Sequence, residues 1–211
     1  MKYILLIFTA TFLLLPLELF AQDTRVVVQN KQRTETLFDR NVDYGGFGAL
    51  QYGVSYINGE AVYLRGTRGA FVVNFRPNHT FNIGYGSYRT ATNFSPIGLA
   101  PEFSNAELRT KYDGFELEYV NSTRKLIHFS TQVTIGSGEV RFDDRNIELP
   151  KTKDTYFFVQ PGLNVNLNLT TWFRLSLGAY YRFANGVDIP GTSDIDLSGP
   201  SAMIGLKFGA F

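Results

Sequence analysis

A strict alternation of apolar and asparagine residues in Gly162–Leu169 constrains the fold of this chain more than any other feature. In an extended segment, Leu163, Val165 and Leu167 lie on one face and the intervening asparagines lie on the other. A half-buried strand of a soluble protein normally turns Lys- and Glu-rich positions to water, whereas this strand offers uncharged amides. The face that lies inside the fold therefore decides the class of protein.

The same alternation recurs in a series of segments after residue 43, separated by turn signals. Eight segments are predicted, at 44–57, 60–75, 80–93, 110–121, 125–140, 155–169, 171–185 and 200–211. Short connections follow the second, fourth and sixth segments, and long ones follow the third, fifth and seventh. The first two segments are joined by a tight Asn58-Gly59 turn. Short turns at one end and long loops at the other are typical of an outer-membrane barrel.

Two closed eight-stranded barrels fit this pattern, and they differ in which face is inside. A lipocalin-like soluble barrel places the apolar residues inside, whereas a membrane barrel places them against lipid. The polar face here is rich in Gly, Asn, Ser and Gln, and charged residues make up only 18% of the chain. Strands of ~10 residues, at ~3.3 Å per residue and tilted about 45°, also cross an apolar band of about 25 Å.

Aromatic residues near the predicted strand ends point the same way, because membrane proteins carry aromatic girdles at both interfaces. They include Phe75, Phe81, Phe157, Tyr181 and Phe183. We therefore predict an all-β fold, an eight-stranded antiparallel up-and-down transmembrane β-barrel, with the asparagines inside.

The N-terminus has the layout of a secretory signal peptide. Lys2 precedes an apolar run from Tyr3 to Leu15, and the predicted cleavage follows Ala21. An uncleaved membrane helix is the less favoured alternative, because the run falls short of the ~20 residues that a span needs.

With these features, residues 44–211 resemble the small eight-stranded outer-membrane β-barrels of the OmpX, OmpW and OmpA-barrel kind. The resemblance rests on the signal peptide, the alternating connections and the last segment, MIGLKFGAF, which ends in Phe211. It implies a location in the cell outer membrane, contact with outer-membrane lipid, and insertion by the barrel-assembly machinery, for which Phe211 and Phe208 form the recognition signal. The chain departs from the usual signal because its last apolar residues fall one position out of register with Phe211.

The resemblance divides the chain into three parts. Residues 1–21 are the expected signal peptide, 22–43 a polar periplasmic segment and 44–211 the outer-membrane barrel domain. Both termini of the mature protein are then expected in the periplasm.

The face predicted to point inward carries six charged residues, and a charge inside a narrow barrel needs a partner. They are Arg68, Glu116, Glu118, Arg174, Arg182 and Lys207. We expect the two glutamates to pair with the basic residues of the second, seventh and eighth segments. Because side chains fill barrels of this size, we interpret the interior as a plug. A narrow channel for small solutes is the alternative.

One pair of residues carries an enzymatic alternative. His128 and Ser130 resemble the His-x-Ser pair of the lipid A deacylases, barrels in which it serves as general base and nucleophile. Both residues belong to the inward set, whereas a lipid substrate lies outside, and no acid is placed to orient His128. We therefore predict a non-enzymatic protein with a structural or surface-interaction role, with the channel second and a lipid-modifying enzyme a distant third.

Composition and spacing give no reason to expect other ligands. The net charge of +1 does not favour nucleic acid, and the absence of Cys removes disulfides and Cys-ligated metals. No acidic spacing matches a metal-binding loop, so neither a metal nor another cofactor is expected. The unusually apolar stretch Ser95–Asn105 makes the loop 95–109 the expected contact for an extracellular partner.

Two strands contain breaks in their pattern. Pro161 falls within a strand whose N–H groups should all be paired, which predicts a bulge at Pro161-Gly162. In the second segment Val62 and Leu64 alternate in one register and Phe71 in the other, which predicts a second bulge in 65–69.

Overall fold

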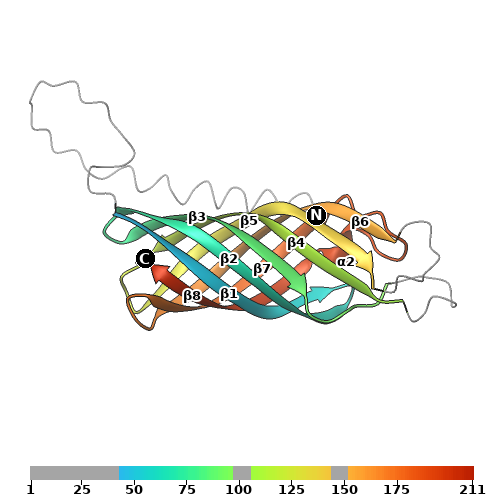
Figure 1. Cartoon of the computed structure of the whole chain (residues 1–211), viewed down its shortest axis with the longest axis horizontal. Coiled ribbons are helices and arrows are strands. Elements are labelled where there is room, and N and C mark those ends of the chain that lie inside the picture. The colour runs from blue at the N-terminus through green and yellow to red at the C-terminus, as the bar shows by residue number, and fades with distance from the viewer. Residues whose placement is uncertain (1–42, 97–105, 144–151) are drawn as a thin grey trace, which may run out of the picture. The chain divides into compact units, whose positions relative to one another are not determined.

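The computed structural model describes residues 43–96, 106–143 and 152–211, which form a closed antiparallel β-barrel (Figure 1). Eight strands follow one another around the barrel in chain order, and β1 pairs with β8 to close it. The strands are β1 (Asp43–Ile57), β2 (Glu60–Arg76), β3 (His79–Thr90), β4 (Leu108–Asn121), β5 (Ile127–Phe142), β6 (Lys153–Asn168), β7 (Phe173–Asn185) and β8 (Gly199–Ala210). The predicted up-and-down barrel is confirmed. The largest boundary difference is at Thr90, where β3 ends three residues before the predicted position.

The two ends of the barrel differ in their connections. The turn end carries the short connections 77–78, 122–126 and 169–172, and the loop end carries 58–59, 91–107, 143–152 and 186–198. The four-residue helix α2 (Asp194–Leu197) lies at the loop end, away from the C-terminus (Figure 1). In barrels with this layout the short turns are periplasmic and the long loops extracellular. Among the described residues, no helix is both long enough and apolar enough to cross a membrane.

The alternation in β6 shows which face is inside. Leu163 and Val165 are 58% and 40% exposed on the outer surface, whereas Asn164 and Asn166 are 2% and 1% exposed. The same alternation holds over most of β5, β7 and β8, where apolar residues face outward and polar ones inward; near the loop end of β5, the apolar Val140 and Phe142 face inward. An apolar exterior around a polar interior suits lipid and not water, so the barrel is of the transmembrane kind.

Aromatic side chains gather at both edges of the apolar exterior. Toward the turn end, Phe173 stacks on Phe208 with ring centroids 4.7 Å apart. Toward the loop end, Tyr181 packs on Phe183, also at 4.7 Å. These positions fit the interfacial girdles predicted from the sequence.

The bulge predicted in 65–69 is wrong. The pairing of β2 with β1 runs without a shift from Asn74 to Glu60, and the irregularity of β2 lies instead between Asn74 and Arg76, opposite β3. Val62 and Leu64 were misleading because they are apolar residues that point into the barrel, where both are buried. The pairing register of β2 is therefore constant, and what changes along the strand is the chemistry of its inward residues, from apolar Val62 and Leu64 to charged Arg68.

The structure also corrects the bulge predicted at Pro161. Pro161 pairs with Val133 of β5 without a shift, and the β6–β7 ladder keeps the same register on both sides of a gap between Val159 and Gly162. A proline has no N–H to donate to a neighbouring strand. The barrel therefore loses local pairing with β7 but gains no extra residue.

Candidate functional site

An ion cluster occupies the middle of the barrel interior. Arg68 Nε lies 2.7 Å from Glu116 Oε2, and Arg68 Nη2 lies 3.0 Å from Glu118 Oε2. Lys207 Nζ lies 3.0 Å from Glu118 Oε1. Two acids and two bases are thus brought together with no net charge, which is the condition under which buried charges are tolerated.

The cluster bridges opposite walls of the barrel. Lys207 comes from β8 and Glu118 from β4, which lie four strands apart in a closed ring of eight. Arg68 of β2 also reaches Gln132 of β5, because its Nη1 donates to Oε1 at 2.8 Å. These links run across the lumen rather than along one wall.

Uncharged polar groups complete the coordination of the carboxylates. Ser130 Oγ donates to Glu118 Oε1 at 2.6 Å, and Asn82 Nδ2 donates to its Oε2 at 3.0 Å. Tyr88 donates its hydroxyl to Glu116 at 2.6 Å. Each carboxylate thereby keeps hydrogen-bond donors after burial, which offsets the loss of water.

The asparagines of β6 belong to this same network. Asn166 Oδ1 accepts from Lys207 Nζ at 3.0 Å, and Asn166 Nδ2 donates to Ser130 Oγ at 3.0 Å. Asn164 donates to Gln132 at 3.3 Å and accepts from the Tyr180 hydroxyl. An amide both donates and accepts, so it suits a crowded polar interior better than a further charge would.

Interior glycines leave the room that these large side chains occupy. A Cβ added at Gly86 would lie 2.3 Å from Glu116 Oε1, and one at Gly162 would lie 2.1 Å from Tyr180 Cδ1. The glycines between polar positions are therefore part of how the large interior side chains fit together.

Arg174 does not pair with the glutamates as the sequence analysis expected for the seventh strand. Its guanidinium lies 3.8 Å from the centre of the Phe211 ring, and its Nη1 donates to Thr123 Oγ1 at 3.2 Å. With Arg76 and Arg124, it lines a cavity of about 470 Å³ at the turn end. Position along the strand explains the error, since Arg174 is the second residue of β7 and lies near the turn end.

Arg182 also lies apart from the cluster, near the loop end. Its Nε donates to the Leu197 carbonyl at 2.8 Å, and its guanidinium carbon lies 4.7 Å from the centre of the Tyr112 ring. Both Nη atoms are buried without a hydrogen-bond partner within the described part of the chain. Arg182 therefore ties the last long loop to the barrel wall instead of neutralising a glutamate.

An apolar cap fills the loop end of the interior, and the sequence analysis missed it. Its members include Ile57, Val62, Leu64, Phe94, Leu108, Tyr112, Val140, Phe142, Phe158, Ile189 and Leu197. Leu197 and Ile189 come from the connection 186–198, which folds over the mouth and is held by the Asn58 N–H donating to the Asp196 carbonyl at 2.7 Å. The sequence signal that could have predicted the cap is the presence of apolar residues at inward positions near the strand ends.

His128 and Ser130 are both buried inside but do not form a catalytic pair. Ser130 donates to Glu118, and His128 Nδ1 lies 3.1 Å from the Lys125 carbonyl. Phe129, between them, faces outward and is 66% exposed. Neither polar side chain therefore faces the surface that a lipid substrate would contact. The described residues contain no group of His, Asp and Glu arranged to hold a metal ion.

The two residues of the expected assembly signal lie in different surroundings. Phe208 faces outward in the aromatic girdle, whereas Phe211 is half-buried against Phe47, with ring centroids 5.6 Å apart. The expected signal peptide, nearly all of segment 22–43 and most of the apolar stretch Ser95–Asn105 lie outside the described residues.

Neither a family model nor a curated protein sequence matches this chain. Among solved structures, it is similar to Neisserial surface protein A, with a TM-score of 0.52 and 10% identity over 80% of this chain and 99% of that one. It is also similar to Ail, the attachment invasion locus protein of Yersinia pestis, with a TM-score of 0.51 and 12% identity over 79% of this chain and 97% of that one. At this identity the likeness concerns the fold. The chain has the eight-stranded barrel fold of these small bacterial proteins, in agreement with the predicted resemblance and the predicted outer-membrane location.

Proposed function

We propose that this protein is a non-enzymatic outer-membrane barrel with a structural or surface-interaction role, whose lumen is closed by its own side chains. The observation that carries the proposal is the ion cluster, in which Arg68, Glu116, Glu118 and Lys207 are all at most 4% exposed. The salt bridge from β4 to β8 spans the lumen at this level.

A second closure lies above the cluster. Leu197 and Phe158 are fully buried in the apolar cap, and the connection that carries Leu197 is hydrogen-bonded to Asn58 and Arg182. A solute entering from the loop end would have to displace this cap and then break buried ion pairs. The interior therefore favours a plug over the alternative of a narrow channel.

A plugged barrel leaves its connections and its outer wall as the surfaces for function. The apolar stretch Ser95–Asn105 remains the proposed contact for an extracellular partner. Replacing Ile97, Leu99 and Phe103 with Ser should abolish capture of that partner on whole cells while the folded barrel persists. Loss of folding would instead assign the stretch to the closure of the barrel.

Conductance in a planar bilayer tests the closed lumen. The folded mature protein should be silent or give rare small events, and Glu118→Ala should increase their number because it removes the carboxylate shared by Arg68 and Lys207. Glu139→Ala is the matched control, since Glu139 pairs with Lys153 away from the ion cluster. Steady conductance of the unmodified protein would overturn the proposal in favour of the channel.

A further inference from the structure

Three basic residues lie side by side on the outer wall of the barrel. Arg65 of β2 is directly opposite Arg89 of β3, and Arg89 is directly opposite Lys111 of β4. All three are exposed, and we call them the basic row. Like charges directly opposite one another in a sheet repel, so this arrangement disfavours the isolated barrel.

The basic row is poorly neutralised by the protein itself. Within the described part of the chain, Arg65 and Arg89 have neither an ion pair nor a side-chain hydrogen bond. Lys111 Nζ lies 3.7 Å from Glu139, but that carboxylate is closer to Lys153, at 2.6 Å. The row therefore offers positive charge to an external anion.

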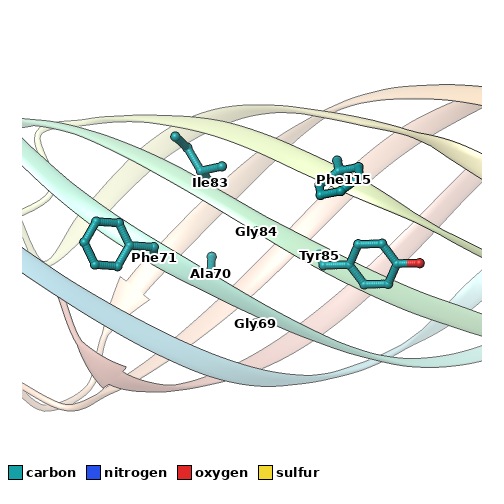
Figure 2. A pocket seen from close by; sticks show the side chains of 7 residues that line it. All are labelled: Gly69, Ala70, Phe71, Ile83, Gly84, Tyr85 and Phe115. Atoms are coloured by element: carbon teal, nitrogen blue, oxygen red, sulfur yellow. The ribbon is translucent and has the colours of Figure 1, made fainter.

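An apolar groove lies on the same three strands, nearer the turn end. Gly69 and Gly84 form its floor and Phe71, Ile83 and Phe115 its sides, and the groove is a shallow, open hollow of about 340 Å³ (Figure 2). Phe71, Ile83 and Phe115 are each more than half exposed, as residues facing lipid are. The groove exists because Gly69 faces outward without a side chain.

The height of the basic row above the groove suits a bilayer in which the groove faces the hydrocarbon layer and the row faces the headgroup layer. Each member of the row is four residues from a groove residue on its own strand: Arg65 from Gly69, Arg89 from Tyr85, and Lys111 from Phe115. Four residues span about 13 Å of strand, or ~9 Å along the membrane normal at a tilt of about 45°. A headgroup layer is roughly 5–8 Å thick, so a groove that begins a few ångströms below the top of the hydrocarbon layer places the row among the headgroups.

Outward basic residues at the loop end continue from the row onto Arg109 of β4, Arg141 of β5 and Lys153 of β6, but not onto the other three strands. The last outward residues at the loop end of β1, β7 and β8 are Tyr56, Asn185 and Pro200, none of which is charged. A basic row above an apolar groove is complementary to an amphiphile with an anionic head and an acyl chain.

We propose that the outer wall of β2–β4 binds a lipid of the outer leaflet, with a headgroup phosphate on Arg65, Arg89 and Lys111 and an acyl chain in the groove. The site goes beyond the proposed function and rests on the assignment of the apolar exterior to lipid. It needs neither a closed lumen nor an extracellular partner.

Native mass spectrometry of the folded protein, released from phosphatidylcholine nanodiscs doped with phosphatidic acid, tests the site. The unmodified barrel should retain phosphatidic acid in preference to phosphatidylcholine. The triple variant Arg65→Gln, Arg89→Gln, Lys111→Gln should lose on the order of 100-fold in affinity, since each basic residue contributes roughly fivefold near an anionic surface. A matched control, Arg76→Gln, Arg124→Gln, Lys125→Gln, removes three exposed charges at the turn end, away from the groove, and should lower the affinity far less than the triple variant does.

The groove is tested by filling it. A Cβ at Gly69 meets only the Phe47 carbonyl oxygen, at 3.8 Å, so Gly69→Leu fits the fold and projects into the groove. It should weaken retention of phosphatidic acid, whereas Ala179→Leu on the exposed face of β7 should not. The shifted migration of folded barrels on unheated gels verifies folding of each variant.

Three results would overturn the proposal. One is equal retention of phosphatidic acid by the triple variant and its turn-end control, and another is unchanged retention by Gly69→Leu. The third is effective competition by a soluble anion. If inorganic phosphate binds the row as tightly as the lipid does, the row is a site for a free anion. If a heparin oligosaccharide does so, the row is a site for a sulfated glycan. None of these results bears on conductance, so failure of this site is distinguishable from failure of the proposed function.

Discussion

The ion cluster makes a quantitative prediction about stability. Glu118→Gln removes one of two negative charges and leaves Arg68 and Lys207 facing Glu116 alone, so the buried cluster acquires one uncompensated positive charge. Breaking a buried pair from one side costs about 3–5 kcal/mol. The double variant Glu118→Gln, Lys207→Met restores neutrality, since Arg68 and Glu116 remain paired at 2.7 Å.

The double variant should therefore be less destabilised than the sum of the two single variants, by about 2–3 kcal/mol, at the upper end of measured coupling energies. Equilibrium unfolding in urea, with the barrel in lipid vesicles, gives the four free energies. The single tryptophan, Trp172, reports the transition because it is exposed in the turn between β6 and β7, where its ring stacks on Phe208.

A surface pair provides the control for this cycle. Glu139 and Lys153 lie 2.6 Å apart, but the Lys153 side chain is 59% exposed, so solvent screens the pair. Its coupling energy should be below about 1 kcal/mol. Strict additivity at Glu118 and Lys207, or equal coupling in the two cycles, would refute the account of the cluster as a buried, mutually neutralising unit.

Two further substitutions test the packing of the interior and the C-terminal residue. Gly162→Ala should destabilise the barrel by about 1–3 kcal/mol, because the new Cβ would lie 2.1 Å from Tyr180, whereas Gly48→Ala, with nothing within 4 Å, should change little in the same urea titration. Phe211→Ala removes the ring that lies 3.8 Å from the Arg174 guanidinium and should cost about 0.5–2 kcal/mol. If the assembly machinery also recognises Phe211, Phe211→Ala should lower the amount of folded barrel in the outer membrane of cells by more than the loss of stability explains. An undiminished amount of folded barrel would count against that role.

The alternation of side chains was enough to predict the barrel and the direction of each face. Period-two patterns survive in β5–β8 because each outward position must suit lipid and each inward position must suit a crowded polar lumen. The pairing of Arg68 and Lys207 with the glutamates also followed from charge and parity, since buried charges need partners.

Sequence reasoning failed where position along the barrel mattered. Parity places a residue inside but does not say at which height, so Arg174 was expected beside the glutamates although it lies near the turn end. Val62 and Leu64 were read as outward because they are apolar, yet they belong to the cap. That cap depends on residues brought together from all eight strands and two connections, and no local pattern encodes such a cluster.

The orientation of the two faces of β6 is the central claim, and spin labels on its apolar face test it most directly. The chain has no Cys, so Leu163→Cys, Val165→Cys and Leu167→Cys each give a single labelling site. In a bilayer, we expect nitroxides at these positions to collide readily with oxygen and rarely with a water-soluble nickel chelate, as lipid-facing labels do. Low collision rates with both reagents would place these residues in a protein core, and the transmembrane barrel would give way to a soluble one with its apolar face inside.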